Sequence, residues 1–185
     1  MPEPADQPTK HSRSMVGFYI AIGVVATLVV AAALLWKPLQ AYRWETQLRK
    51  NAATGLSVCA TFTLADGTSG FAYSTPQEAI RLCSIGPASA PAFRRLMRSP
   101  DQAVKISAAL ALGEADKWGL PILLEAASDA DDLVALQAIR SAERLAKRQF
   151  APGQYLSHQP AAAAAAGRRA LREWWEAEGR AEHGR

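Results

Sequence analysis

Two cysteines and three histidines are the first residues to consider for chemistry, because thiols and imidazoles serve as nucleophiles, bases and metal ligands. Cys59 and Cys83 are the only cysteines in the 185 residues. A bridge between them would suit an oxidising compartment, would close a loop of about 24 residues and would contribute about 3 kcal/mol. The other interpretation is two buried thiols that pack as small hydrophobes. We treat Cys59 and Cys83 as a candidate disulfide.

The histidines and carboxylates form no catalytic or metal-binding pattern. The histidines fall in segments expected to be tails and a linker: His11, His158 and His183. Asp129, Asp131 and Asp132 cluster, but they lack the spacing of a calcium loop, and Asp is favoured at the start of a helix. The sequence contains no Cys-x-x-Cys, His-Glu-x-x-His, Gly-x-Ser-x-Gly or phosphate-binding glycine loop. We therefore predict no catalytic residue, no metal site, no cofactor and no enzyme activity.

Five side chains are candidates for a surface that binds a partner. Arg94, Arg95 and Arg98 place three cations on one expected helix, where they either dock an acidic partner or acidic lipid headgroups, or simply face solvent. Trp174 and Trp175 give an apolar anchor to an otherwise charged helix. They either cover the end of a helical domain or form a hot spot for a partner.

The element that would place the rest of the chain beside a membrane is an uncharged apolar run over 15–36. As a helix it is long enough to span a hydrocarbon core of about 30 Å. Its apolar residues lie all round the helix, which disfavours a buried core helix. A cleaved signal peptide is the second alternative, because Ala31 and Ala33 follow a basic stretch, but the run continues past that point. We predict an uncleaved single-pass anchor. The side chains expected at its membrane interface are Trp36, Lys37, Tyr42, Arg43 and Trp44.

Two arguments on the orientation of this anchor disagree. The nearby cations are Lys10 and Arg13 before the run, and Lys37, Arg43, Arg49 and Lys50 after it. Counting them places the C-terminal part in the cytoplasm. A short N-terminal tail with cations close to the run is instead typical of a signal anchor, which exports the rest of the chain. We expect a cell-membrane protein, in a bacterial inner membrane, with its C-terminal domain outside the cytoplasm.

The charge balance limits the classes of partner. The net charge is +4, from 21 basic and 17 acidic residues that are interleaved along the chain, so the electrostatic potential is mild. We expect no nucleic acid and no small-molecule substrate. The expected partners are the lipid bilayer and a protein in or near the membrane.

Composition divides the chain into segments. They are a disordered tail over 1–14, the anchor over 15–36, a juxtamembrane segment over 37–55, a β-hairpin plus helix over 56–86, two repeats over 87–148, a linker over 149–167, and a capping helix and tail over 168–185. Asp66 and Gly67 mark the hairpin turn between two short stretches rich in β-branched and aromatic residues. Thr75 and Pro76 then predict the N-cap and first turn of a helix.

The repeats emerge when Pro91 is aligned with Pro121, an offset of about 30 residues. Each copy predicts a helix that starts near its proline, a turn, and a second helix capped by Asp101 or Asp131. In the first copy a stripe of mostly small side chains lies four residues apart, at Val104, Ala108 and Leu112. Such a stripe lets helices approach closely, so these helical hairpins are expected to stack.

The segment Pro-x-Phe-x-x-Leu-Met-x-Ser-Pro-Asp-x-x-Val-x-x-x-Ala-Ala-x-x-Leu-Gly, from Pro91 to Gly113, resembles the short HEAT-like repeats of the phycobilisome lyase type. In the second copy Arg140 and Glu143 replace Leu110 and Gly113 of that pattern. The resemblance implies protein binding and scaffolding, and it carries no catalytic residue onto this chain. The expected fold is mainly α: a single transmembrane helix, then a small α-solenoid with a short β-hairpin at its N-terminal end.

Two functions fit these observations. In the first, the protein is a non-catalytic interaction or scaffold module held near the bilayer. In the second, it is a small accessory subunit of a larger membrane complex, packed through its membrane helix, where Gly17, Gly23 and Ala26 would allow a neighbour to approach.

Overall fold

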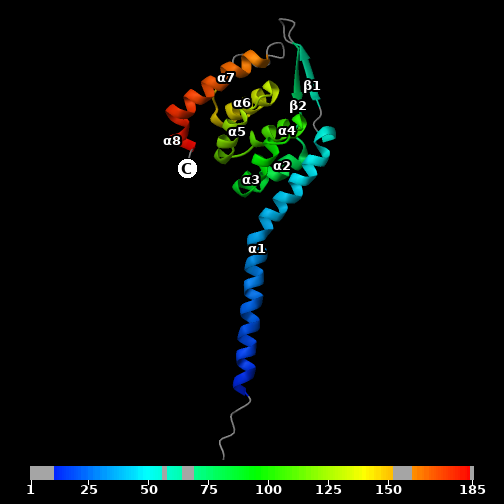
Figure 1. Ribbon diagram of the computed structural model, residues 1–185, viewed down its shortest axis with the longest axis vertical. Coiled ribbons are helices and arrows are strands. Elements are labelled where there is room, and N and C mark those ends of the chain that lie inside the picture. The colour runs from blue at the N-terminus through cyan, green and yellow to red at the C-terminus, as the bar shows by residue number, and fades with distance from the viewer. Residues whose placement is uncertain (1–10, 56–57, 64–68, 152–159, 184–185) are drawn as a thin grey trace, which may run out of the picture. The chain divides into compact units, whose positions relative to one another are not determined.

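The computed structural model describes residues 11–55, 58–63, 69–151 and 160–183, with side chains over 22–52, 74–151 and 161–182. The described chain is mainly helical. It falls into two units, Met1–Lys37 and Pro38–Arg185. One helix, α1 (His11–Gly55), contributes to both units, and the remaining elements belong to the second (Figure 1).

Helix α1 begins at His11, inside the segment 1–14 that the sequence predicts to be a disordered tail. The residues before His11 lie outside the described part. The predicted anchor and juxtamembrane segment form one unbroken helix instead of two, with Pro38 inside it. Because proline has no N–H to donate to the carbonyl four residues earlier, the helix lacks one backbone hydrogen bond there. The boundary between the two units falls at this residue.

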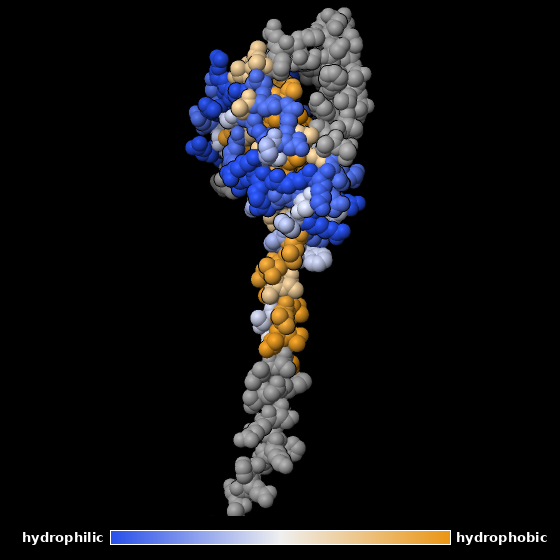
Figure 2. Space-filling model, turned by 45° about the vertical axis from the view of Figure 1, so that its right-hand side comes forward, coloured by the Kyte–Doolittle hydropathy of each residue, from blue (hydrophilic) through white to orange (hydrophobic). Residues whose placement is uncertain are grey.

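The first unit exposes an apolar surface over 22–36, where its side chains are described. From Ile22 to Trp36 its large apolar side chains are exposed, and Figure 2 shows them along the described part of α1. Helix α1 is long and apolar enough to cross a membrane by length and composition. A core helix of a soluble protein would bury these side chains, whereas here none of the most apolar window is buried. A signal sequence shares these properties.

In the second unit, β1 (Val58–Thr63) and β2 (Ser69–Tyr73) pair antiparallel, with Thr61 opposite Phe71. Their side chains lie outside the described set. Helix α2 (Gln77–Ser84) comes next, and Pro76 occupies its N-cap position without a side-chain hydrogen bond. The predicted cap at Thr75 is therefore wrong by one residue.

Two pairs of helices form the centre of the second unit. They are α3 (Ala90–Met97) with α4 (Gln102–Leu112), and α5 (Leu120–Ala126) with α6 (Asp132–Ala146). The single turns η1 (Gly86–Ser89) and η2 (Lys117–Gly119) precede the two pairs. Pro91 and Pro121 lie in the first turns of α3 and α5. Asp101 and Asp131 cap α4 and α6 by accepting backbone N–H groups at 2.8 and 2.9 Å, so both predicted caps are confirmed.

Helix α4 is the middle of the core. It contacts α2, α3, α5 and α6, and Val104, Ala108 and Leu112 are at most 2% exposed. Burial extends beyond this predicted stripe, because Ala109 and Ala111 are also fully buried. A helix rich in alanine can be surrounded on all sides, since short side chains let several neighbours approach its backbone.

The last long helix of the described chain starts at Pro160, next to the earlier of its two predicted starts, Ala161 and Arg168. Helix α7 (Pro160–Trp174) includes the alanine run that the sequence suggests as part of a linker, and it packs beside α6. Ala163 and Ala164 are buried, and a Cβ on Gly167 would lie 3.0 Å from Ile139 Cγ2. Small side chains thus allow the close approach of α7 to α6. Figure 1 shows α7 on the far side of α4 and α6 from the C-terminal part of α1.

A π-helical turn, η3 (Trp175–Gly179), continues α7 and leads into α8 (Arg180–His183). The tail from Arg180, which the sequence predicts to be frayed, is helical over 180–183. The backbone N–H of Arg180 donates to the carbonyl of Trp175, which is the five-residue bond of a π turn.

Candidate functional site

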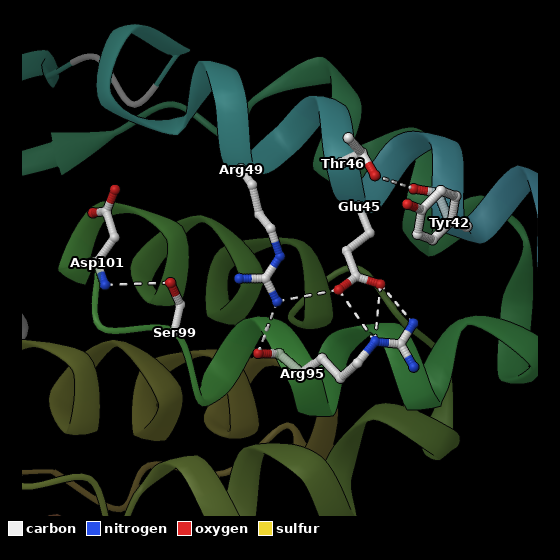
Figure 3. Close-up of polar contacts among 7 residues, drawn as sticks. All are labelled: Tyr42, Glu45, Thr46, Arg49, Arg95, Ser99 and Asp101. Atoms are coloured by element: carbon white, nitrogen blue, oxygen red, sulfur yellow. Dashed lines mark hydrogen bonds and ion pairs between the residues drawn. The ribbon is translucent and has the colours of Figure 1, made fainter.

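The most developed polar site joins the C-terminal part of α1 to α3. Glu45 lies on α1 with only 7% of its side chain exposed, and Figure 3 shows Arg95 of α3 beside its carboxylate. The Nε of Arg95 donates to both carboxylate oxygens at 3.2 and 3.1 Å, and its Nη2 donates to Oε2 at 2.6 Å. This two-pronged geometry is the strongest form of a charge-assisted hydrogen bond.

A second arginine completes the site from α1 itself. Arg49, one turn after Glu45, donates from Nη2 to Oε1 of Glu45 and to the backbone carbonyl of Arg95, both at 3.1 Å (Figure 3). The Glu45 hydrogen bond raises the pKa of the Arg95 guanidinium above its usual value. The carboxylate is thus shared by two guanidinium groups, so the arrangement connects two helices instead of activating a nucleophile.

Buried apolar side chains of α1 lie around this polar contact. Ala41, Leu48 and Ala52 are at most 5% exposed, and with Glu45 they match the three-to-four-residue spacing of one helix face. Asn51 adds a hydrogen bond of 3.1 Å to Glu78 of α2. The part of α1 after Pro38 is therefore packed into the second unit, with Glu45 as its one buried charge among the described residues.

Glu45 and Arg49 were not predicted as site residues. The sequence pattern that could have indicated them is an acidic residue and a basic residue four positions apart. In a helix, the apolar positions 41, 48 and 52 lie on the same face as Glu45. We interpreted that segment as interfacial, and an interfacial helix turns this face toward lipid headgroups instead of toward a core.

Of the side chains predicted at the membrane interface, Trp44 is the one that packs against the helical unit. Its indole is half-buried against the core, with the Arg81 guanidinium 4.8 Å and the Arg43 guanidinium 5.3 Å from the ring centroid. Its place at the interface stays a prediction. Trp36 and Tyr42 are exposed, at 62% and 66%, as the prediction requires of them. Lys37 and Arg43 are exposed as well.

The three arginines of the predicted partner surface do not act together. Arg95 is engaged by Glu45, Arg94 lies 3.6 Å from Glu125 of α5, and Arg98 is exposed at the end of α3. Arg95 is thus not free for a partner, because its guanidinium is committed to a buried carboxylate. The same-face pair Arg94 and Arg98 stays a prediction.

Trp174 and Trp175 are each 7% exposed, which favours the covering role over a hot spot for a partner. Their rings lie 6.2 Å apart edge to face, and Trp174 lies 5.1 Å from Phe150. Gly179 closes this cluster, because a Cβ there would lie 2.9 Å from Trp175 and 3.0 Å from Trp174. Burial leaves little indole surface for a partner in this conformation, and the hot-spot alternative stays a prediction.

Cys83 is a free, buried thiol on α2, so the structure does not form the predicted disulfide at this residue. The side chain of Cys59 lies outside the described set. Burial, together with the nearby charges of Glu114 and Asp116, raises the pKa of the Cys83 thiol to about 11. The Cys83 side chain packs in the core, as in the alternative of a thiol that acts as a small hydrophobe.

The aspartate cluster between α5 and α6 serves caps and ion pairs. Asp129 accepts from Lys105 Nζ at 2.7 Å, Asp131 caps α6, and Asp132 pairs with Arg168 of α7. No group of three or more potential metal ligands occurs among the described residues. Among the histidines, His11 and His183 belong to helices α1 and α8, and His158 lies outside the described residues.

With this geometry in place, comparison with known proteins gives no family: no family model, curated protein or solved structure matches the chain.

Proposed function

We propose that this protein is a single-pass membrane-anchored module of HEAT-like helical repeats, which binds another protein near the bilayer and has no catalytic role. The contact around Glu45 is the observation that carries this proposal. It fixes the residues that come after the apolar segment of α1 to a packed helical unit, so a span in the membrane would hold that unit near the membrane surface.

The repeat assignment is supported by the correspondence of the two helix pairs. Both pairs have a proline in the first turn and an aspartate cap, at positions 30 residues apart. Helices α4 and α6 pack on each other, and α7 then covers α6. Stacked pairs of this kind present a continuous surface, and solenoids use such surfaces for binding proteins.

For the orientation we propose that the second unit lies outside the cytoplasm. Replacing exposed Glu173 by cysteine, in a chain with Cys59→Ser and Cys83→Ala, gives one accessible thiol on α7. A membrane-impermeant maleimide should label this thiol in intact cells. Labelling only after lysis would reverse the proposed orientation.

The alternative is an accessory subunit held in a larger complex by its membrane helix. The specific observation that favours it is the surface of α1 at Gly23, where a Cβ would meet nothing within 4 Å, next to exposed Ala26 and Thr27. Small residues of this kind allow close approach of another membrane helix.

Photo-cross-linking separates the two functions. A benzophenone residue is placed either at Leu28 of α1 or at Glu173 of α7, both of which are exposed, and each version is also made with 15–36 exchanged for a plain Leu/Ala helix. The module proposal predicts adducts from position 173 that survive the helix exchange. Adducts from position 28 alone, lost on exchange, would establish the subunit role, and the absence of adducts from both positions would contradict both functions.

A further inference from the structure

We infer that a cavity between α5 and the α7–α8 segment binds an acidic peptide segment of the partner protein. This inference rests on the proposed function, because it names the partner chemistry of a protein-binding module. The cavity has a volume of about 260 Å³. That volume is below the usual range for whole small-molecule ligands and suits one or two side chains.

Three arginines line the cavity from one side. Arg168, Arg172 and Arg180 lie four and eight residues apart along α7, η3 and α8. In a regular α-helix, positions four apart drift by about 40° per step around the axis. The π turn η3 has a longer hydrogen-bonded turn, and this offsets the drift. The irregular turn thereby brings Arg180 to the same cavity as Arg168 and Arg172.

These arginines hold unused donors. Arg168 pairs with Asp132 through Nη2, but its buried Nε–H has no hydrogen-bond partner in the described part of the chain. Arg172 and Arg180 are exposed and make no ion pair within the described residues. The exposed guanidinium groups of Arg172 and Arg180 therefore keep donors that a ligand carboxylate can accept in a two-pronged geometry.

The rest of the lining selects the class of anion. Leu124 of α5, which is only partly buried, supplies apolar surface beside the arginines, and this surface suits an aliphatic or aromatic neighbour of the carboxylate. Glu125 and Glu176 also line the cavity. Two carboxylates repel a continuous array of phosphates, such as a nucleic acid backbone, but they leave room for one carboxylate placed among three arginines. A mixed acidic and apolar peptide meets both conditions.

The test begins with a random octapeptide library displayed on phage, selected against the full chain in lipid nanodiscs. We expect the selected peptides to contain Asp or Glu beside an apolar residue. The strongest of them, labelled with fluorescein, is then the probe for titrations by fluorescence anisotropy. Replacing its acidic residues by the isosteric amides should weaken binding at least tenfold.

Three variant chains are compared with this probe. Arg172→Glu and Arg180→Glu should each weaken binding at least tenfold, while Arg169→Glu, which makes the same charge change at an exposed position outside the cavity, should retain the affinity. Circular dichroism and urea unfolding confirm that each variant folds.

Other outcomes overturn the inference in distinguishable ways. Selected peptides without acidic residues, or no selected peptides at all, would remove the acidic ligand. Equal binding by all three variants would place the site elsewhere. A polyphosphate or an oligonucleotide could instead bind as tightly as the selected peptide and lose its affinity in Arg172→Glu. That result would show that the ligand of the cavity is a phosphate polymer and not a peptide. None of these results changes the cross-linked adducts expected from position 173. The proposed function is therefore tested independently of this inference.

Discussion

The loss of folding stability on breaking the contact between Glu45 and its arginines depends on which side chain is replaced. Arg95→Ala leaves a buried carboxylate with Arg49 alone, so we expect a loss of about 2 kcal/mol in the free energy of unfolding. Glu45→Gln leaves two arginines that are already 38% and 53% exposed and can be hydrated, so the loss should be smaller, about 1 kcal/mol. Urea unfolding of the full chain in detergent micelles measures both values.

Arg98→Ala is the matched control for these variants, because Arg98 is exposed on the same helix end. Its effect should stay within about 0.5 kcal/mol. A larger loss from Glu45→Gln than from Arg95→Ala would contradict the account of a buried carboxylate that needs its partners.

The thiol of Cys83 predicts a pH dependence of stability. Its pKa is raised to about 11 in the folded chain from an ordinary value of 9.0, so the folded state holds the proton more tightly than the unfolded state does. This contribution is fully present below pH 9 and is lost as the pH rises from about 9 to 11. Between pH 8 and pH 10 the wild-type chain should therefore lose about 1 kcal/mol more than Cys83→Ala does, measured by urea unfolding at each pH. An equal decline in both chains would show that the thiol titrates normally when folded.

Single residues were predictable where their role is local. Asp101 and Asp131 could be assigned from the preference of helix starts for aspartate, which needs no knowledge of the rest of the fold. Trp44 and Arg95 were assigned to surfaces because exposed and buried aromatic or basic residues look alike in a sequence. Their actual partners, Arg81 and Glu45, lie on other helices, and only the packing of α1 on α2 and α3 brings them together.

At the scale of elements, the π turn η3 makes a prediction through Gly179. A methyl group there would lie within 3.0 Å of both indole rings, so Gly179→Ala should destabilise the protein by about 1–3 kcal/mol. Elsewhere in a helix the same change stabilises by about 0.5–1 kcal/mol, so the sign is informative. Thermal unfolding followed by tryptophan fluorescence measures the effect. Exposed Glu173→Ala on α7 is the control, and a stabilising Gly179→Ala would contradict the packed tryptophan cluster.

Whole elements were predictable to the extent that periodicity and caps define them. The four central helices could be placed from the spacing of prolines, aspartates and apolar residues, whereas α1 was divided between Trp36 and Lys37 and α7 between Gly167 and Arg168. Proline disfavours a helix interior by about 3 kcal/mol, but strong helix formers on both sides can outweigh this. The alanine run was assigned to a linker because it is low in complexity, although burial of Ala163 and Ala164 against α6 makes it part of the core.

At the scale of the whole molecule, the sequence predicts a mainly helical protein with one long apolar helix, and the structure agrees with that coarse description. The π turn and the cavity beside it were not predictable. Arginines four and eight residues apart along a charged helix look like a solvated face, and their convergence depends on the extra residue in the turn. Leu124 and Glu125 come from α5, a separate element whose approach to α7 no local pattern encodes.

The membrane anchor itself is best tested by the intact mass of the protein in membranes washed with alkaline carbonate. We predict that the chain stays in the membrane pellet at full length, because a bilayer would cover the exposed apolar side chains of α1. Replacing Val24, Val25, Leu28 and Val29 by aspartate should release it. Release of the unaltered chain by the wash, or a mass corresponding to cleavage after Ala33, would contradict an uncleaved anchor that holds the helical unit at the membrane.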